Sequence, residues 1–137
     1  MNRKAMTLTE LLMVVAIIAI ISALSMPMML KSIEKGKVGE ASTNLNFIRT
    51  AQKHYFLANG TFSSDIDSLP IENPNAQTNR YFYYEASQAG DDLSVDFTAR
   101  ATRGVGGAQP APGGYGYYYE ISKDGDITPE AGCPFTF

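Results

Sequence analysis

An uncharged run of twenty residues, Leu11 to Leu30, constrains this 137-residue chain more than any other feature of its sequence. Only Ser22 and Ser25 are clearly polar within the run. As a helix it would be about 30 Å long, which matches the hydrocarbon core of a bilayer. We therefore expect a transmembrane helix near the start of the chain. The remaining residues can bury only a modest core by themselves.

A cleaved secretory signal peptide is the alternative reading of this region. Arg3 and Lys4 supply the charged start that such a peptide needs, but the apolar run is too long and lacks a convincing A-x-A cleavage site. Pro27 and three methionines stand near the end of the run instead of such a site. The same two basic residues favour an N-terminus on the inner side of the membrane and a C-terminal domain on the outer side, although three lysines also lie just past the span.

Glu10 stands at the head of the apolar run, where an acid is costly unless it is paired or interfacial. One reading is an interfacial acid at a helix N-terminus, where the helix dipole favours negative charge. In the second interpretation of Glu10, cleavage of the chain before Met6 frees an α-amino group, which stays mostly protonated at neutral pH. Glu10 of one subunit would then pair with the Met6 amine of a neighbour and set the register of a stack.

The segment from Lys4-Ala5 through Met6-Thr7-Leu8-Thr9-Glu10 and the apolar run to Ile21 resembles the class III signal of type IV pilins and type II secretion pseudopilins. The resemblance covers about residues 4–30 and is specific as a set. It implies cleavage between Ala5 and Met6 by a prepilin peptidase, N-methylation of Met6, and assembly through Met6 and Glu10. Pro27 matches the family's helix-kinking proline. The family usually has Gly before the cut and Phe after it, where this chain has Ala5 and Met6.

The resemblance also implies partners and a location. The partners are other copies of the chain in a helical filament, the peptidase, and an inner-membrane assembly platform. The precursor would be a single-pass inner-membrane protein. The mature subunit would belong to an extracellular type IV pilus-like filament or, as the alternative, to a periplasmic pseudopilus of type II secretion. A membrane-tethered periplasmic binding domain is a further alternative.

Beyond the span, the sequence predicts that the helix continues to Asn59-Gly60. Pro27 should kink or locally open it, because proline lacks an N–H and clashes with the preceding turn. Apolar residues then recur at helical spacing and predict a face that packs on a small sheet: Val38, Ala41, Leu45, Ile48 and Tyr55. Polar residues predict the opposite, solvent-facing side: Glu40, Asn44, Asn46, Arg49 and Lys53.

The C-terminal part predicts a loop over 61–79, strands over 80–85, 93–100 and 117–121, and a return strand beginning at Ile127-Thr128. Gly104–Gly116 reads as a surface loop, and Lys123–Asp126 as a turn. The expected fold is α+β: a long N-terminal helix on an antiparallel sheet of three to four strands. The expected organisation is a leader (1–5), a transmembrane helix (6–30), an amphipathic helix (31–59) and a β-rich domain (60–137). Half of the clustered tyrosines should face the helix and half the outside.

Charge and residue usage exclude several functions. Residues 60–137 carry eleven acidic and four basic residues, which disfavours nucleic-acid binding by that part. Cys133 is the single cysteine and excludes an intrachain disulfide; His54 has no partner for a metal site. Asp124 and Asp126 are weak calcium candidates, and a turn is the preferred reading. We expect no cofactor, and no nucleophile–base pair indicates an enzyme.

Overall fold

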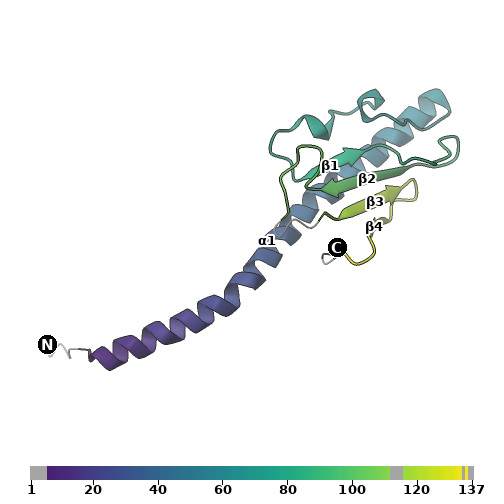
Figure 1. Ribbon diagram of the computed structural model, residues 1–137. Helices are drawn as coiled ribbons and strands as arrows, with labels where there is room; N and C mark the ends of the chain where they lie inside the picture. The colour runs from purple at the N-terminus through teal and green to yellow at the C-terminus, as the bar shows by residue number, and fades with distance from the viewer. Residues whose placement is uncertain (1–5, 112–115, 134, 136–137) are drawn as a thin grey trace. The chain divides into compact units, whose positions relative to one another are not determined.

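The computed structural model of the protein describes residues 6–111, 116–133 and 135. Figure 1 shows one long helix followed by two short 3-10 helices and four strands. Their bounds are α1 (Leu8–Asn59), η1 (Ile66–Ser68), η2 (Pro74–Ala76), β1 (Phe82–Glu85), β2 (Thr98–Arg103), β3 (Tyr118–Ser122) and β4 (Ile127–Pro129). The chain divides into two compact units, Met1–Lys35 and Gly36–Phe137. The expected α+β class is confirmed.

The four strands form one antiparallel sheet in the order β1-β2-β3-β4. The second half of α1 packs on one face of this sheet. Four of the five residues expected on its apolar face are buried, and Tyr55 is half-buried against the same core. On the central strand β2, Ala99 and Ala101 are fully buried in the same core as the apolar stripe of α1.

The tyrosine-rich strands alternate as expected. Tyr84, Tyr117 and Tyr119 are buried, whereas Tyr83 and Tyr118 are half-exposed on the opposite side. The rings of Tyr117 and Tyr119 meet edge to face with centroids 5.7 Å apart. The Tyr84 hydroxyl donates to Glu40 Oε1 (3.1 Å) and accepts from Asn44 Nδ2 (3.0 Å). Burial raises the pKa of Tyr84 far above its usual range, so the ring stays neutral.

Three residues expected on the solvent side of α1 instead tie the helix to the sheet and its loops. The Glu40 carboxylate also accepts the backbone N–H of Tyr81 (3.1 Å). Arg49 donates from Nε to the carbonyl of Lys123 and from Nη2 to that of Asp124, both at 2.9 Å. Glu40, Asn44 and Arg49 flank the apolar stripe, and their long or polar side chains reach over its border. Asn46 and Lys53 are exposed as expected.

Gln52 is fully buried on the packing face of α1, and its amide is hydrogen-bonded at both ends. Its Nε2 donates to the carbonyls of Ser63 (2.7 Å) and Ala86 (2.9 Å). Its Oε1 accepts the backbone N–H of Ser63 (2.8 Å). The Gln52 side chain therefore holds two places in the fold: Ser63, in the segment after α1, and Ala86, the residue after β1.

Replacement of Gln52 by leucine should lower the free energy of unfolding by about 2–3 kcal/mol, because three buried backbone groups lose their partner. The neighbouring exposed Lys53→Leu serves as control and should change it by less than about 0.5 kcal/mol. Chemical unfolding of both variants in detergent, followed by tyrosine circular dichroism, measures the difference. Equal stability of the two variants would contradict this role of Gln52.

The strand expected over 93–100 is wrong in its first half. Residues 92–97 form a turn in which the carbonyl of Asp92 accepts the N–H groups of Val95 (2.8 Å) and Asp96 (2.9 Å). The Asp92 carboxylate accepts from the hydroxyl and N–H of Ser94, which lowers the pKa of Asp92. Asp and Ser side chains that bond their own backbone compete with a strand, so β2 begins only at Thr98.

The other element boundaries differ less from those expected from the sequence. β1 begins two residues later than expected, because the N–H of Tyr81 goes to the Glu40 carboxylate. β3 is shifted by one residue, to Tyr118–Ser122. The segment expected as a loop holds the two 3-10 helices, each begun by an Asx cap, Asp65 for η1 and Asn73 for η2.

Two glycines end elements as expected. Gly60 follows α1 with a φ of 74°, and its N–H donates to the carbonyl of Phe56 (2.8 Å). Gly125 forms the β3–β4 turn with a φ of 103°. A Cβ on Gly125 would lie 2.6 Å from the Arg49 guanidinium carbon and would displace it, and the positive φ itself favours glycine here.

Both edges of the sheet are protected. The side-chain amide of Asn75 pairs with β1 like a short strand: its Oδ1 accepts the N–H of Tyr84 (2.9 Å) and its Nδ2 donates to the carbonyl (2.8 Å). At the other edge, the N–H of Glu130 donates to Tyr118 (2.9 Å), which makes Tyr119 and Pro129 a non-hydrogen-bonded pair. Pro129 therefore turns its nitrogen, which carries no hydrogen, to the open side.

Candidate assembly site at the start of the helix

The first turn of α1 is a capping box that contains Glu10. Thr7 is the N-cap, and its carbonyl accepts the N–H of Leu11 (3.2 Å). The backbone N–H and the hydroxyl of Thr7 both donate to Glu10 Oε2 at 2.9 Å. The Thr7 Oγ1 accepts the N–H of Glu10 (3.3 Å). The threonine and the acid three residues later thus satisfy each other's backbone groups and fix the helix start.

The sequence interpretation concentrated on the charge of Glu10 and missed Thr7. A T-x-x-E sequence directly before an apolar run is itself the signal for this motif. Both Thr7 donors use the same carboxylate oxygen, so Glu10 Oε1 can accept from a donor outside the turn. Glu10 is exposed, and its capped carboxylate is held in one position at the tip of the helix.

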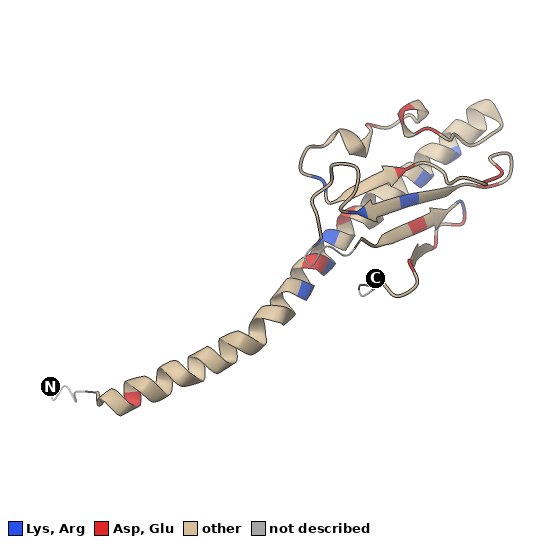
Figure 2. Ribbon diagram, in the orientation of Figure 1, with Lys and Arg blue, Asp and Glu red and all other residues tan. Residues whose placement is uncertain are grey.

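The apolar part of α1 is uncovered in the single chain. α1 contains a segment long and apolar enough to cross a membrane, with a mean hydropathy of 2.5 and none of the segment buried. Figure 2 shows the helix without charge colouring between its first turn and the lysines that begin at Lys31. Its side chains form a shallow apolar groove lined by Leu8, Leu11, Leu12, Val15, Ala16 and Ala19. Such a surface needs lipid or protein around it.

The helix runs through Pro27 without a break in this structure, so the expected local opening is not seen here. Proline lacks an N–H, and the carbonyl of Ala23 therefore has no helical donor at this turn. One turn earlier, the hydroxyl of Ser25 donates to the carbonyl of Ile21 (2.9 Å). A bend at Pro27 in an assembled state stays a prediction.

The other candidate residues fall in different places. Ala5 lies outside the described residues, and Met6 is 67% exposed just before the helix. Asp124 and Asp126 are exposed in the β3–β4 turn, where the Arg49 guanidinium bonds the Asp124 carbonyl. Within the described part of the chain, no group of three or more His, Cys, Asp or Glu residues could hold a metal ion.

Comparison with known proteins agrees with the geometry of the helix start. The sequence model of the prokaryotic N-terminal methylation motif matches residues 1–26. The chain is also 36% identical over 90 residues to the type IV major pilin protein PilA of Myxococcus xanthus (strain DK1622). This alignment covers 66% of the chain but only 40% of that relative. The chain thus carries the prokaryotic N-terminal methylation motif and is a distant homologue of a type IV major pilin.

Proposed function

We propose that the protein is a structural subunit of a type IV pilus-like filament. The observation that carries the proposal is the apolar part of α1, which is uncovered, headed by a capped acid and mostly covered by the matched methylation motif. In the precursor this helix anchors the chain in the inner membrane. In the filament the same helices pack against one another, and the β-rich unit forms the outer surface.

The leader, residues 1–5, is removed between Ala5 and Met6, and Met6 is then N-methylated. Removal places a positive α-amino group four residues before Glu10. The Glu10 carboxylate of one subunit pairs with the Met6 amine of its neighbour in an apolar bundle, where both charges need a partner. The pair sets the axial register, and Pro27 lets the packed helix bend.

The similarity to a major pilin favours a surface pilus over a secretion pseudopilus. Electron microscopy of cells that express the protein distinguishes the two. Long surface fibres that label with an antibody to this chain support the pilus. Their absence, with the protein retained in the periplasm, supports the pseudopilus.

Mass spectrometry of the protein from its native host tests processing. The mature N-terminus should be N-methylated Met6, and an Ala5→Gly variant should be processed at least as completely. An Ala5→Arg variant should keep its leader, because a bulky charged residue does not fit where a small one is cleaved. An intact Met1, or a cut after residue 20, would contradict the proposal.

A further inference from the structure

The sequence N-G-T stands where α1 ends, at Asn59, Gly60 and Thr61. The pattern N-x-S/T, with any residue except proline in the middle, is the acceptor sequence for N-linked glycans, which are attached to surface segments of exported chains. Asn59 is the only one of the seven asparagines that stands in this pattern. In the expected orientation, Asn59 and the rest of the β-rich unit lie on the outer side of the membrane. The end of α1 is therefore a candidate modification site.

The side chain of Asn59 is exposed at the end of the helix. Its Nδ2 donates to the carbonyl of Tyr55, one turn earlier (3.0 Å), which uses one of the two hydrogens of the amide. Gly60 follows with a φ of 74° and turns the chain away from the helix, so no further helical turn covers Asn59. A sugar in place of the other hydrogen therefore disturbs no buried contact.

Thr61 supplies the hydroxyl that the pattern requires, but the folded chain uses this group. Thr61 is half-buried, and its hydroxyl donates to the carbonyl of Leu93 (2.9 Å). The N–H of Phe62 donates to the same carbonyl (2.8 Å). An enzyme that recognises the hydroxyl has access to it only before residues 61–62 pack on Leu93. Transfer of a glycan would therefore precede completion of the fold, which afterwards leaves Asn59 on the outside.

Asn59 borders a shallow depression of about 630 Å³ between the last turns of α1 and the end of η1. The depression is lined by His54, Tyr55, Ala58, Asn59, Ser68 and Pro70. Its volume lies within the range of roughly 300–1,000 Å³ that is common for small-molecule sites. Tyr55 and Pro70 offer apolar surface to the CH groups of a sugar ring. His54 and Ser68 are exposed and offer hydrogen-bonding groups to its hydroxyls.

A second hollow, of about 270 Å³, lies farther along the same flank of α1. Its helix residues, Asn44 and Phe47, are spaced from His54 and Ala58 as the residues of one helix face are. The opposite wall of both hollows comes from the segment 68–77. The two hollows therefore form one groove, here named the flank groove, between α1 and this segment. From Asn59 to Asn44 the flank groove extends over about 22 Å, at about 1.5 Å per helical residue.

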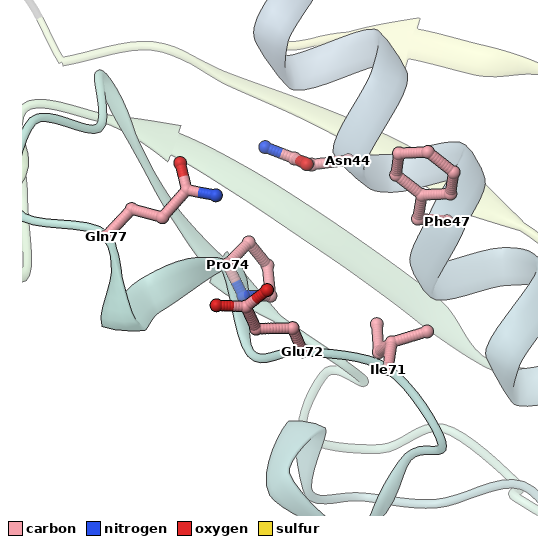
Figure 3. Close-up of a pocket in the computed structure, with 6 residues that line it drawn as sticks. All are labelled: Asn44, Phe47, Ile71, Glu72, Pro74 and Gln77. Atoms are coloured by element: carbon pink, nitrogen blue, oxygen red, sulfur yellow. The ribbon is translucent and has the colours of Figure 1, made fainter.

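The second hollow combines apolar and hydrogen-bonding surface. Figure 3 shows the ring of Phe47 on the helix, with Ile71 and Pro74 opposite. Phe47 is 59% exposed, which leaves the ring open for a sugar to pack on it. Amide and carboxylate groups that bond hydroxyls line the same hollow: Asn44, Glu72 and Gln77. The flank groove therefore suits a saccharide, whose rings are apolar on their faces and polar at their edges.

We propose that Asn59 carries an N-linked oligosaccharide that lies along the flank groove. The inference goes beyond the proposed filament, because it requires only that the β-rich unit is exported. The donor is a lipid-linked oligosaccharide pyrophosphate in the membrane, and a membrane-bound oligosaccharyltransferase of the host makes the transfer. A bond forms between Asn59 Nδ2 and the anomeric carbon of the first sugar, while the bond from this carbon to the pyrophosphate breaks. Nδ2 loses one proton, the lipid pyrophosphate leaves with the electron pair, and neither reactant is oxidised or reduced.

Mass spectrometry of the full-length protein from its native host tests the site. Trypsin releases peptide 54–80, which contains Asn59. This peptide should be heavier by the mass of the glycan, and fragmentation should place the sugars on residue 59. Asn59→Gln and Thr61→Val should lose the modification completely, whereas Thr61→Ser should keep it. Asn79→Gln is the matched control: Asn79 is exposed in the same peptide but outside the pattern, and its replacement should leave the glycan in place.

Two results of this experiment would overturn the proposal. One is a wild-type peptide in which residue 59 is unmodified. The other is a glycan that persists in Asn59→Gln or in Thr61→Val, because it would then be attached to another residue or independently of the pattern.

A comparison of single and double variants tests the position of the glycan along the flank groove. Phe47→Ala should lower the midpoint of chemical unfolding in detergent at least about twice as far in the glycosylated chain as in the Asn59→Gln background, because only the first has sugars on the ring. Val95→Ala is the control: Val95 is 58% exposed in the turn before β2, and its replacement should shift both midpoints equally. Equal shifts for Phe47→Ala would overturn this position of the glycan.

These outcomes are separable from failure of the proposed function. If wild type forms filaments and residue 59 is unmodified, the filament proposal stands and the glycan is refuted. If residue 59 carries the glycan in a chain that forms no filaments, the glycan stands and the filament proposal fails.

Discussion

We expect Glu10→Gln to abolish the proposed filament assembly although it preserves the helix cap. Glutamine at this position can still accept from the Thr7 hydroxyl and N–H, as the acid does at 2.9 Å. What it loses is the negative charge. In the proposed bundle, the Met6 amine of the neighbour would then be an uncompensated charge in an apolar environment, which costs several kcal/mol per subunit. Filament yield should fall by more than about a hundredfold.

Two further variants separate charge from capping. Glu10→Ala removes both and should also lose filaments, while membrane insertion and leader removal persist. Thr7→Ala keeps the charge but removes the cap, at a cost of about 1 kcal/mol, and should still form filaments at a reduced yield. Sheared-fibre yield and mass spectrometry of the N-terminus are measured for all three. Normal filaments from Glu10→Gln would mean that the capping box, not the charge, is the function of Glu10.

Arg103→Met should cost about 3–5 kcal/mol of folding stability, a large effect for one substitution. Arg103 is fully buried on the inner face of β2. Its guanidinium donates to the carbonyls of Tyr81 (3.0 Å), Gln109 and Pro110 (3.3 Å). Methionine fills a similar volume, but the three carbonyl groups belong to the backbone and stay in place when the arginine is replaced. They would be left buried and without this donor.

The matched control is Arg100→Met on the same strand. Arg100 lies on the outer face of the sheet, where its Nη2 is 2.6 Å from Glu120 Oε1 and both side chains remain about a quarter to a third exposed. Loss of a solvent-screened pair costs about 0–1 kcal/mol. Chemical unfolding in detergent compares the two variants. If Arg103→Met is as stable as Arg100→Met, the backbone acceptors of Arg103 do not depend on it.

These two arginines show which features of the sheet could be predicted from the sequence and which could not. Arg100 and Arg103 are three residues apart, so they point to opposite faces of a strand. The sequence predicts that relation once the strand is known, but the expected strand ended at Arg100. Which arginine is buried depends on the loop that follows β2, whose carbonyls surround Arg103. Contacts of this kind join distant residues and leave no periodic signal.

The helix was easier to predict than the sheet. Its apolar run, its buried stripe and its end at Gly60 follow local rules of spacing and capping. The turn at Asp92 to Phe97 was missed because the alternation of apolar and polar residues favours a strand, whereas the bonds of Ser94 to the Asp92 side chain compete with it. At the candidate assembly site, Glu10 was interpreted by its charge, and its capping partner Thr7 was not predicted, although the T-x-x-E motif indicates this pair.

The protected sheet edges have a consequence for the proposed function, in which precursor subunits gather in a membrane before they assemble. Crowded domains with open strands are prone to join sheet to sheet, and such growth is stable and difficult to reverse. In this chain Asn75 occupies one edge, and Pro129 deprives the other of a donor. Strand-to-strand growth is therefore suppressed on both sides. Under the proposed function, subunits therefore gather without joining sheet to sheet, and their polymerisation depends on the helix alone.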